Sequence, residues 1–184
     1  MHVALPKTRG SEKLPPSEQQ LGFLAAGNDA ILGYVGGFLI TTSRGRPLEF
    51  HYSTPVKPSP THRILYGPEL EPYIFGELIG ANLIRQTKLD VSFLLTDQPM
   101  LLGQRPSSSC PIICVTIVPV APDVADLPNT AQLDFKSWPG FEPDVETLGR
   151  WLQGVNENLD LREPFGRVWE ALRAVLGGES KQAA

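Results

Sequence analysis

Residues 37–53 read GFLITTSRGRPLEFHYS, and this stretch decides the fold class that the sequence predicts. An apolar run ends at Thr42, the polar segment 43–45 follows, and the residues after it alternate between apolar and polar side chains, a period typical of a half-buried strand. The alternation separates Leu48, Phe50 and Tyr52 on one face from Glu49, His51 and Ser53 on the other. We therefore expect a β-hairpin here.

A helical pattern follows the hairpin at residues 69–87, ELEPYIFGELIGANLIRQT. At 100° per residue, one apolar stripe contains Leu70 and Ile74, and a second on the opposite side contains Phe75, Ile79 and Leu83. Each of the two apolar faces of such a helix must pack against another element or a partner. We expect the sheet to cover one face, and the C-terminal helices or a second subunit to cover the other.

Gly76 and Gly80 open a flat strip along this helix, at a cost of about 1 kcal/mol each relative to alanine. Some other part of the protein must therefore approach closely there. Packing inside the fold explains the spacing best, and a dimer seam or a ligand-facing role remain as alternatives.

Beyond the helix the period returns to two around Phe93, and residues 111–120 form a β-branched run typical of a buried strand. The sequence TDQP at 96–99 predicts a turn, with a returning strand from Met100. The predicted fold class is α+β: an antiparallel sheet of about five strands with one central helix packed on a face, plus a C-terminal helical hairpin.

The chain divides into five segments. Asp144 is a candidate N-cap for the first C-terminal helix, and the pair Gly177-Gly178 a candidate stop for the second. The predicted segments are a disordered tail at 1–20, an α+β sheet domain at 21–120, a Pro-rich ordered connection at 121–143, a helical hairpin packed on the same domain at 144–178, and a disordered end at 179–184.

Composition and charge restrict the compartment and the partners. The 184 residues carry 16 Lys and Arg against 20 Asp and Glu, a net charge of −4, which argues against a protein that coats nucleic acid over its whole surface. The sequence has no apolar run of about 20 residues and no secretory leader. Two cysteines cannot form a disulfide framework. We expect a cytoplasmic protein without membrane contact.

Candidate chemistry centres on His51, which shares a strand face with Glu49 and Ser53. A carboxylate can orient a histidine, and the histidine can activate a hydroxyl. The same three residues are equally typical of the solvent face of a half-buried strand. A pocket between this face and loop 103–109, with His51 shielded from water, would favour the first interpretation.

The two cysteines, Cys110 and Cys114, lie on one side of a predicted strand about 13 Å apart, too far for a shared tetrahedral metal. No phosphate-binding loop or other catalytic motif is present in the sequence. We therefore expect buried, unreactive thiols, no catalytic residues, no cofactor and no metal, and we lean away from an enzyme.

The first functional hypothesis is a non-enzymatic protein-interaction or assembly module that associates with itself. The two-faced helix and the amphipathic C-terminal pair present more apolar surface than one sheet face can cover. The expected partner is a protein or a second copy of the chain, in preference to nucleic acid. The candidate interaction residues are Arg44, Arg46, His51, Tyr52, Phe75, Gly76, Ile79, Gly80 and Leu83.

Two alternatives remain open. One is a small-ligand binder or enzyme with a site around Glu49, His51 and Ser53. The other is a weak nucleic-acid contact through the basic hairpin 44–63, which would bind less tightly as salt is raised. The cations of that hairpin are Arg44, Arg46, Lys57 and Arg63.

Overall fold

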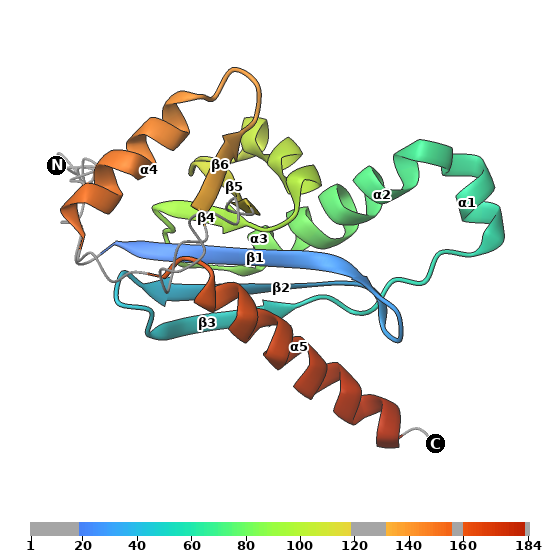
Figure 1. Cartoon of the computed structure of the whole chain (residues 1–184). Helices are drawn as coiled ribbons and strands as arrows, with labels where there is room; N and C mark the ends of the chain where they lie inside the picture. Colours follow the sequence, from blue (N-terminus) through green and yellow to red (C-terminus); the bar gives the residue numbers. More distant parts are fainter. Residues whose placement is uncertain (1–18, 119–131, 156–159, 183–184) are drawn as a thin grey trace, which may run out of the picture.

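A computed structural model describes residues 19–118, 132–155 and 160–182, and Figure 1 shows their arrangement. Six strands form one mixed sheet in the order β3-β2-β1-β4-β5-β6. Their bounds are β1 Gln20–Asp29, β2 Gly33–Thr42, β3 Pro47–Tyr52, β4 Phe93–Thr96, β5 Ile112–Val118 and β6 Gln132–Ser137.

Strands β1, β2 and β3 form an antiparallel unit, which contains the predicted hairpin as β2 and β3. Strand β1 pairs with β2 over its full length. The turn between them is held by Asp29, whose carboxylate accepts from the amide groups of Ile31 and Leu32. Gly33 then closes the turn with a φ of 87°, a left-handed value that glycine adopts without strain.

The predicted all-antiparallel sheet of about five strands is wrong in its pairing. Strands β1, β4 and β5 are parallel neighbours, and only β6 returns to antiparallel pairing at the far edge. Residues 99–107 form the 3₁₀ segment η4 in place of a returning strand. The physical reason lies at Gln98, whose side chain accepts from the amide of Met100, so that the predicted turn begins a helix.

One face of the sheet is covered by the connection between β3 and β4 and by η4. The connection contains α1 Pro60–Tyr66, η2 Gly67–Glu69, α2 Leu70–Tyr73, the π-helical segment η3 Ile74–Ala81, and α3 Asn82–Gln86. The segments from α2 to α3 follow one another with helical backbone angles at each junction. The apolar core beneath them includes Phe38, Ile79 and Leu101, all with at most 1% of their surface exposed.

The second face of the predicted two-faced helix is covered by η4, which packs along η3. A β-carbon added at Gly80 would lie 2.4 Å from Leu101 Cδ2, so the glycine makes room for a side chain of η4. Gly76 similarly faces Gln104. Five of the candidate interaction residues therefore lie inside the fold: Phe75, Gly76, Ile79, Gly80 and Leu83.

The opposite face of the sheet carries α4 Pro143–Gly154 and α5 Glu163–Gln182. In Figure 1 they lie over different strands, α4 near β5 and β6, and α5 across β1 and β2. The predicted helical hairpin is thus two separately docked helices. Asp144 lies in the first turn of α4 and not at its N-cap, and α5 continues through the glycine pair at 177–178.

Most of the predicted disordered tail and part of the predicted Pro-rich connection lie outside the described residues, whereas residues 179–182 of the predicted disordered end belong to α5. Within 121–143, residues 132–137 form strand β6, which belongs to the sheet. No helix in the described ranges has both the length and the apolar character needed to cross a bilayer.

We expect Gly80→Ala to lower the free energy of unfolding. The added methyl would overlap Leu101 and lie 3.0 Å from the Phe75 carbonyl oxygen, and overpacking of this kind costs about 1–3 kcal/mol. This exceeds the gain of about 1 kcal/mol in helix propensity. Gly149→Ala in α4, where the added methyl meets no atom within 4 Å, is the control and should stabilise. Urea unfolding measures both, and a stabilised Gly80→Ala would contradict the packing argument.

Candidate functional site

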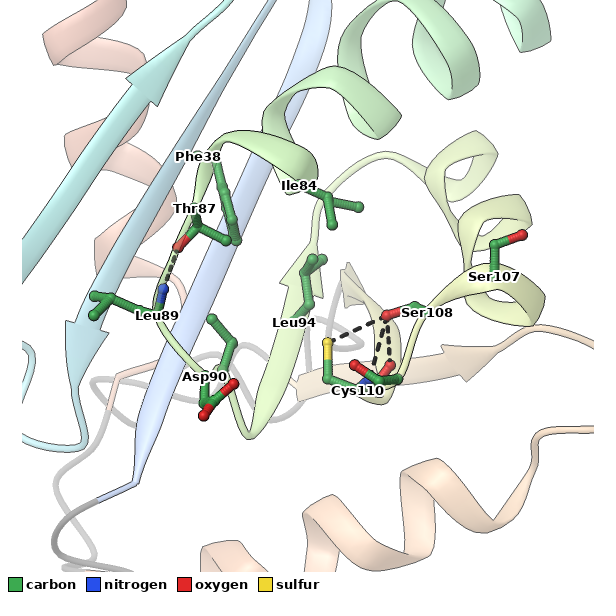
Figure 2. Close-up of a pocket in the computed structure, with 11 residues that line it drawn as sticks. Phe38, Ile84, Thr87, Leu89, Asp90, Leu94, Ser107, Ser108 and Cys110 are labelled. Carbon is green, nitrogen blue, oxygen red and sulfur yellow. Dashed lines mark hydrogen bonds between the residues drawn. The ribbon is translucent and has the colours of Figure 1, made fainter. Parts of the chain in front are cut away.

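A cavity of about 230 Å³ opens on the face of the sheet that α3 and η4 cover, at the amino ends of β4 and β5. Figure 2 shows Thr87, Leu89 and Asp90 on one side of it and Ser108 and Cys110 on the other. The full set of lining residues is Phe38, Ile84, Thr87, Leu89, Asp90, Val91, Leu94, Ser107, Ser108, Ser109 and Cys110.

The floor of the cavity depends on a glycine in the central strand. Gly22 pairs with Leu94 of β4, and the Phe38 ring from β2 lies directly over it. A β-carbon at position 22 would lie 2.6 Å from Phe38 Cε2 and 3.1 Å from Val91 Cγ1. The absence of a side chain in β1 therefore lets an aromatic ring, Leu94 and Val91 form a continuous apolar surface.

One wall is built where α3 ends and the chain turns into β4. Thr87 has an extended backbone that ends the helix. Its hydroxyl accepts from the Leu89 amide at 3.1 Å and donates to Glu49 Oε2 of β3 at 2.9 Å. This wall is thereby tied to the hairpin strand that carries His51.

The other wall is the serine-rich loop between η4 and β5. The hydroxyl of Ser108 accepts from the amide of Cys110 at 3.3 Å and donates to the carbonyl oxygen of the same residue at 3.0 Å. Its oxygen also lies 3.4 Å from Cys110 Sγ. These contacts fold the loop into a tight turn over the cavity.

Arg105 fixes this turn from outside the cavity. Its Nη1 donates to the Ser108 carbonyl at 2.9 Å, while Nε and Nη2 form a paired contact with the Asp144 carboxylate of α4. Its guanidinium also lies 4.3 Å from the centre of the Phe141 ring. Arg105 and Asp144 are 14% and 11% exposed, so the pair is largely removed from solvent screening.

The thiol of Cys110 is uncharged at neutral pH, because burial raises its pKa above the ordinary value of 9. Hydrogen bonding to Ser108 and the charge of Arg105 act in the opposite direction but do not reverse the shift. Cys114 lies in the core of β5, and burial raises its pKa to about 11. Neither thiol is poised as a nucleophile.

The predicted group of Glu49, His51 and Ser53 is only partly assembled. Nε2 of His51 lies 3.1 Å from Glu49 Oε2, and the His51 side chain is 25% exposed. Hydrogen bonds from His51 and Thr87 lower the pKa of Glu49. The Ser53 hydroxyl instead accepts from the Gly36 amide, and none of the three lines the cavity. They lie behind the Thr87 wall.

The cations of the basic hairpin do not form one patch. Arg44 and Arg46 lie at the turn after β2, whereas Lys57 packs beside Gly33 at the start of that strand. The ten residues of β2 separate the two groups by about 30 Å at about 3.3 Å per residue. The fourth cation, Arg63, lies in α1, so the basic residues of 44–63 are spread over separate parts of the structure.

A half-buried carboxylate, Asp97, lies just beyond the carboxyl end of β4. Oδ1 accepts from the Ala26 amide at 3.2 Å, and Oδ2 accepts from Trp169 Nε1 of α5 at 3.1 Å. Burial raises the pKa of Asp97, and the bonds from Trp169 and Ala26 oppose that shift. Gly27 makes room for the Trp169 ring, so this end of the sheet is filled by α5.

The part of the chain that the structure describes contains no cluster of three or more His, Cys, Asp or Glu placed to hold a metal ion. Sequence reasoning did point to loop 103–109 as one wall of a pocket. It missed the opposite wall at 87–91 and the floor at Phe38, because an apolar residue that lines a cavity has the same sequence pattern as one in the core.

No protein-family model and no curated protein matches this sequence. Endonuclease V of Ciona intestinalis, solved with a 23mer DNA containing an inosine, is 12% identical, covers 55% of this chain and has a TM-score of 0.35. The chain spans about half of that enzyme, 47%. LC11-RNase H1, solved in complex with an RNA/DNA hybrid, is 12% identical and has a TM-score of 0.30. The match covers 83% of this chain and 92% of the RNase H1 chain.

Both neighbours are nucleases with nucleic acid bound, contrary to the first functional hypothesis. The prediction of a non-enzymatic, self-associating interaction module is withdrawn, and so is the preference for a protein partner over nucleic acid. At this identity and these TM-scores the likeness assigns no activity to the chain. The proposal below therefore rests on the cavity.

The half-buried Asp97 generates a pH-dependent stability. Because its folded pKa is raised above the ordinary 3.8, the folded state holds the proton more tightly than the unfolded chain. This contribution is present below the ordinary pKa and is lost as pH rises through the raised one. Urea titrations at several pH values measure the free energy of unfolding of the wild type and of Asp97→Asn. We expect the wild-type value minus the Asp97→Asn value to fall as pH rises from the ordinary pKa through the raised pKa of Asp97.

Trp169→Phe provides the second variant for this test. It removes a donor that favours the charged form, so the fall should move to higher pH. A difference between wild type and Asp97→Asn that stays constant with pH would contradict the assignment.

Proposed function

We propose that this protein binds a small organic molecule in the cavity between residues 84–91 and 107–110. The observation that carries the proposal is the cavity itself, in which the apolar side chains of Phe38, Ile84 and Leu94 lie beside hydroxyl, thiol and carboxylate groups. Ligand sites in proteins likewise combine apolar side chains with a few placed polar groups.

The volume sets the size of the ligand. Drug-sized ligands occupy pockets of about 300–1,000 Å³, and an apolar cavity of about 150 Å³ accepts benzene. The 230 Å³ found here lies between the two, which corresponds to one ring with a short polar chain.

The walls are held in place before any ligand arrives. Thr87 is tied to the hairpin through Glu49, and Ser108 is tied to the opposite layer through Arg105. A cavity whose walls are already ordered loses less conformational entropy on binding. This supports a binding site over a transient gap in the packing.

The candidate reactive groups near the cavity are held in other contacts. The Cys110 thiol is held neutral, and the Ser108 hydroxyl is committed to the backbone of its own turn. His51 lies behind the wall, oriented by Glu49, and Ser53 is not beside it. The hydroxyl, histidine and carboxylate therefore do not form a nucleophile and base pair.

The proposal is tested with 2-phenylethanol, which has one ring and a two-carbon alcohol. We expect millimolar binding in an amide NMR titration, with the largest shifts at Thr87, Leu94 and Ser108. Ser109→Trp places an indole at the exposed rim and should weaken binding by at least about tenfold, or 1.4 kcal/mol.

Gln153→Trp is the matched control, since it adds the same side chain at an exposed position of α4 on the other sheet face. It should leave the titration unchanged. Shifts spread evenly over the molecule, or equal weakening by both variants, would reject the cavity as the binding site.

A further inference from the structure

The electrostatic balance of the cavity is set by Asp90. It is the single charged residue among the eleven that line the cavity, and its side chain is exposed at the rim. Figure 2 shows it beside Leu89, across the cavity from the serine loop. The remaining lining residues are apolar or neutral, so a bound molecule meets one formal negative charge.

Two cations lie close to the cavity in the structure or the sequence without lining it. Arg105, behind the opposite wall, directs two nitrogens to Asp144 and the third to the Ser108 carbonyl. Lys88 precedes Asp90 by two positions in the chain but does not line the cavity, and its charge acts on Glu49. Among the residues that line the cavity, no cation accompanies the charge of Asp90.

The acceptors at the rim suit a donor-rich group. An ammonium group has three donors and no acceptor. The Asp90 carboxylate supplies acceptor oxygens for such a group. A carboxylate or phosphate ligand would be repelled by Asp90, and a neutral alcohol could donate a hydrogen bond to the carboxylate but would form no ion pair.

The apolar interior requires that the rest of the ligand be hydrocarbon. Phe38, Ile84 and Leu94 form the interior and offer no polar side-chain atom. A fully charged or polyhydroxylated molecule would lose hydration there without replacement. The preferred ligand is thus apolar at one end and cationic at the other.

We propose that the cavity selects small primary amines with an apolar body, the ammonium group lying at Asp90 and the hydrocarbon part on Phe38 and Leu94. This inference rests on the proposed ligand-binding function and specifies the chemical class of its ligand.

The test compares three probes of nearly equal shape: phenethylamine, 2-phenylethanol and phenylacetate. Dissociation constants are measured by amide NMR at neutral pH, where the amine is protonated. We expect the amine to bind about fivefold more tightly than the alcohol, the size of a partly exposed ion pair, and phenylacetate to bind most weakly. The preference for the amine should shrink in molar salt.

Asp90→Asn should remove the preference and leave the alcohol's affinity unchanged. Glu170→Gln, which removes the same charge from the exposed surface of α5 on the other face of the sheet, should preserve it. Equal binding of amine and alcohol, or a preference that survives Asp90→Asn, would overturn the amine assignment while leaving ligand binding intact. Failure of all three probes to bind would overturn the proposed function itself.

Discussion

The structure depends on the parallel pairing of β1, β4 and β5. Parallel neighbours cannot be joined by a tight turn, so each connection must cross a face of the sheet. Both crossings, residues 53–92 and 97–111, run over the same face, where η4 packs on η3. The first crossing ends at the amino end of β4, and the second ends at the amino end of β5. The cavity lies where they descend, so its two walls are the ends of the two crossings.

Some of this could be predicted from sequence, because short-range periodicity is encoded locally. The alternation after Arg46 specifies a strand of the hairpin, and the stripes of 69–87 specify a helix buried on two sides. Pairing direction is not encoded in this way, since β4 has the same pattern in either orientation. The turn residues 96–99 also suit a 3₁₀ start at Pro99, and only tertiary packing decides between the two.

The site was less predictable for the same reason. Loop 103–109 was recognisable from its polarity, and the pairing of Glu49 with His51 followed from their spacing on one strand. Phe38 gave no indication of a cavity, because its position depends on Gly22 in a different strand. The contact of Glu49 with Thr87, 38 residues away, likewise depends on where α3 ends relative to β3.

Arg105 connects the two layers of the molecule. It belongs to η4 on one face of the sheet, yet its carboxylate partner Asp144 belongs to α4 on the other. Replacing a largely buried ion pair by apolar groups is often neutral or stabilising, so such a pair is weak evidence for stability alone. The pair instead orients Arg105: two hydrogen bonds to Asp144 hold the guanidinium in place, and a third fixes the Ser108 carbonyl. The position of α4 thereby determines the position of the cavity rim.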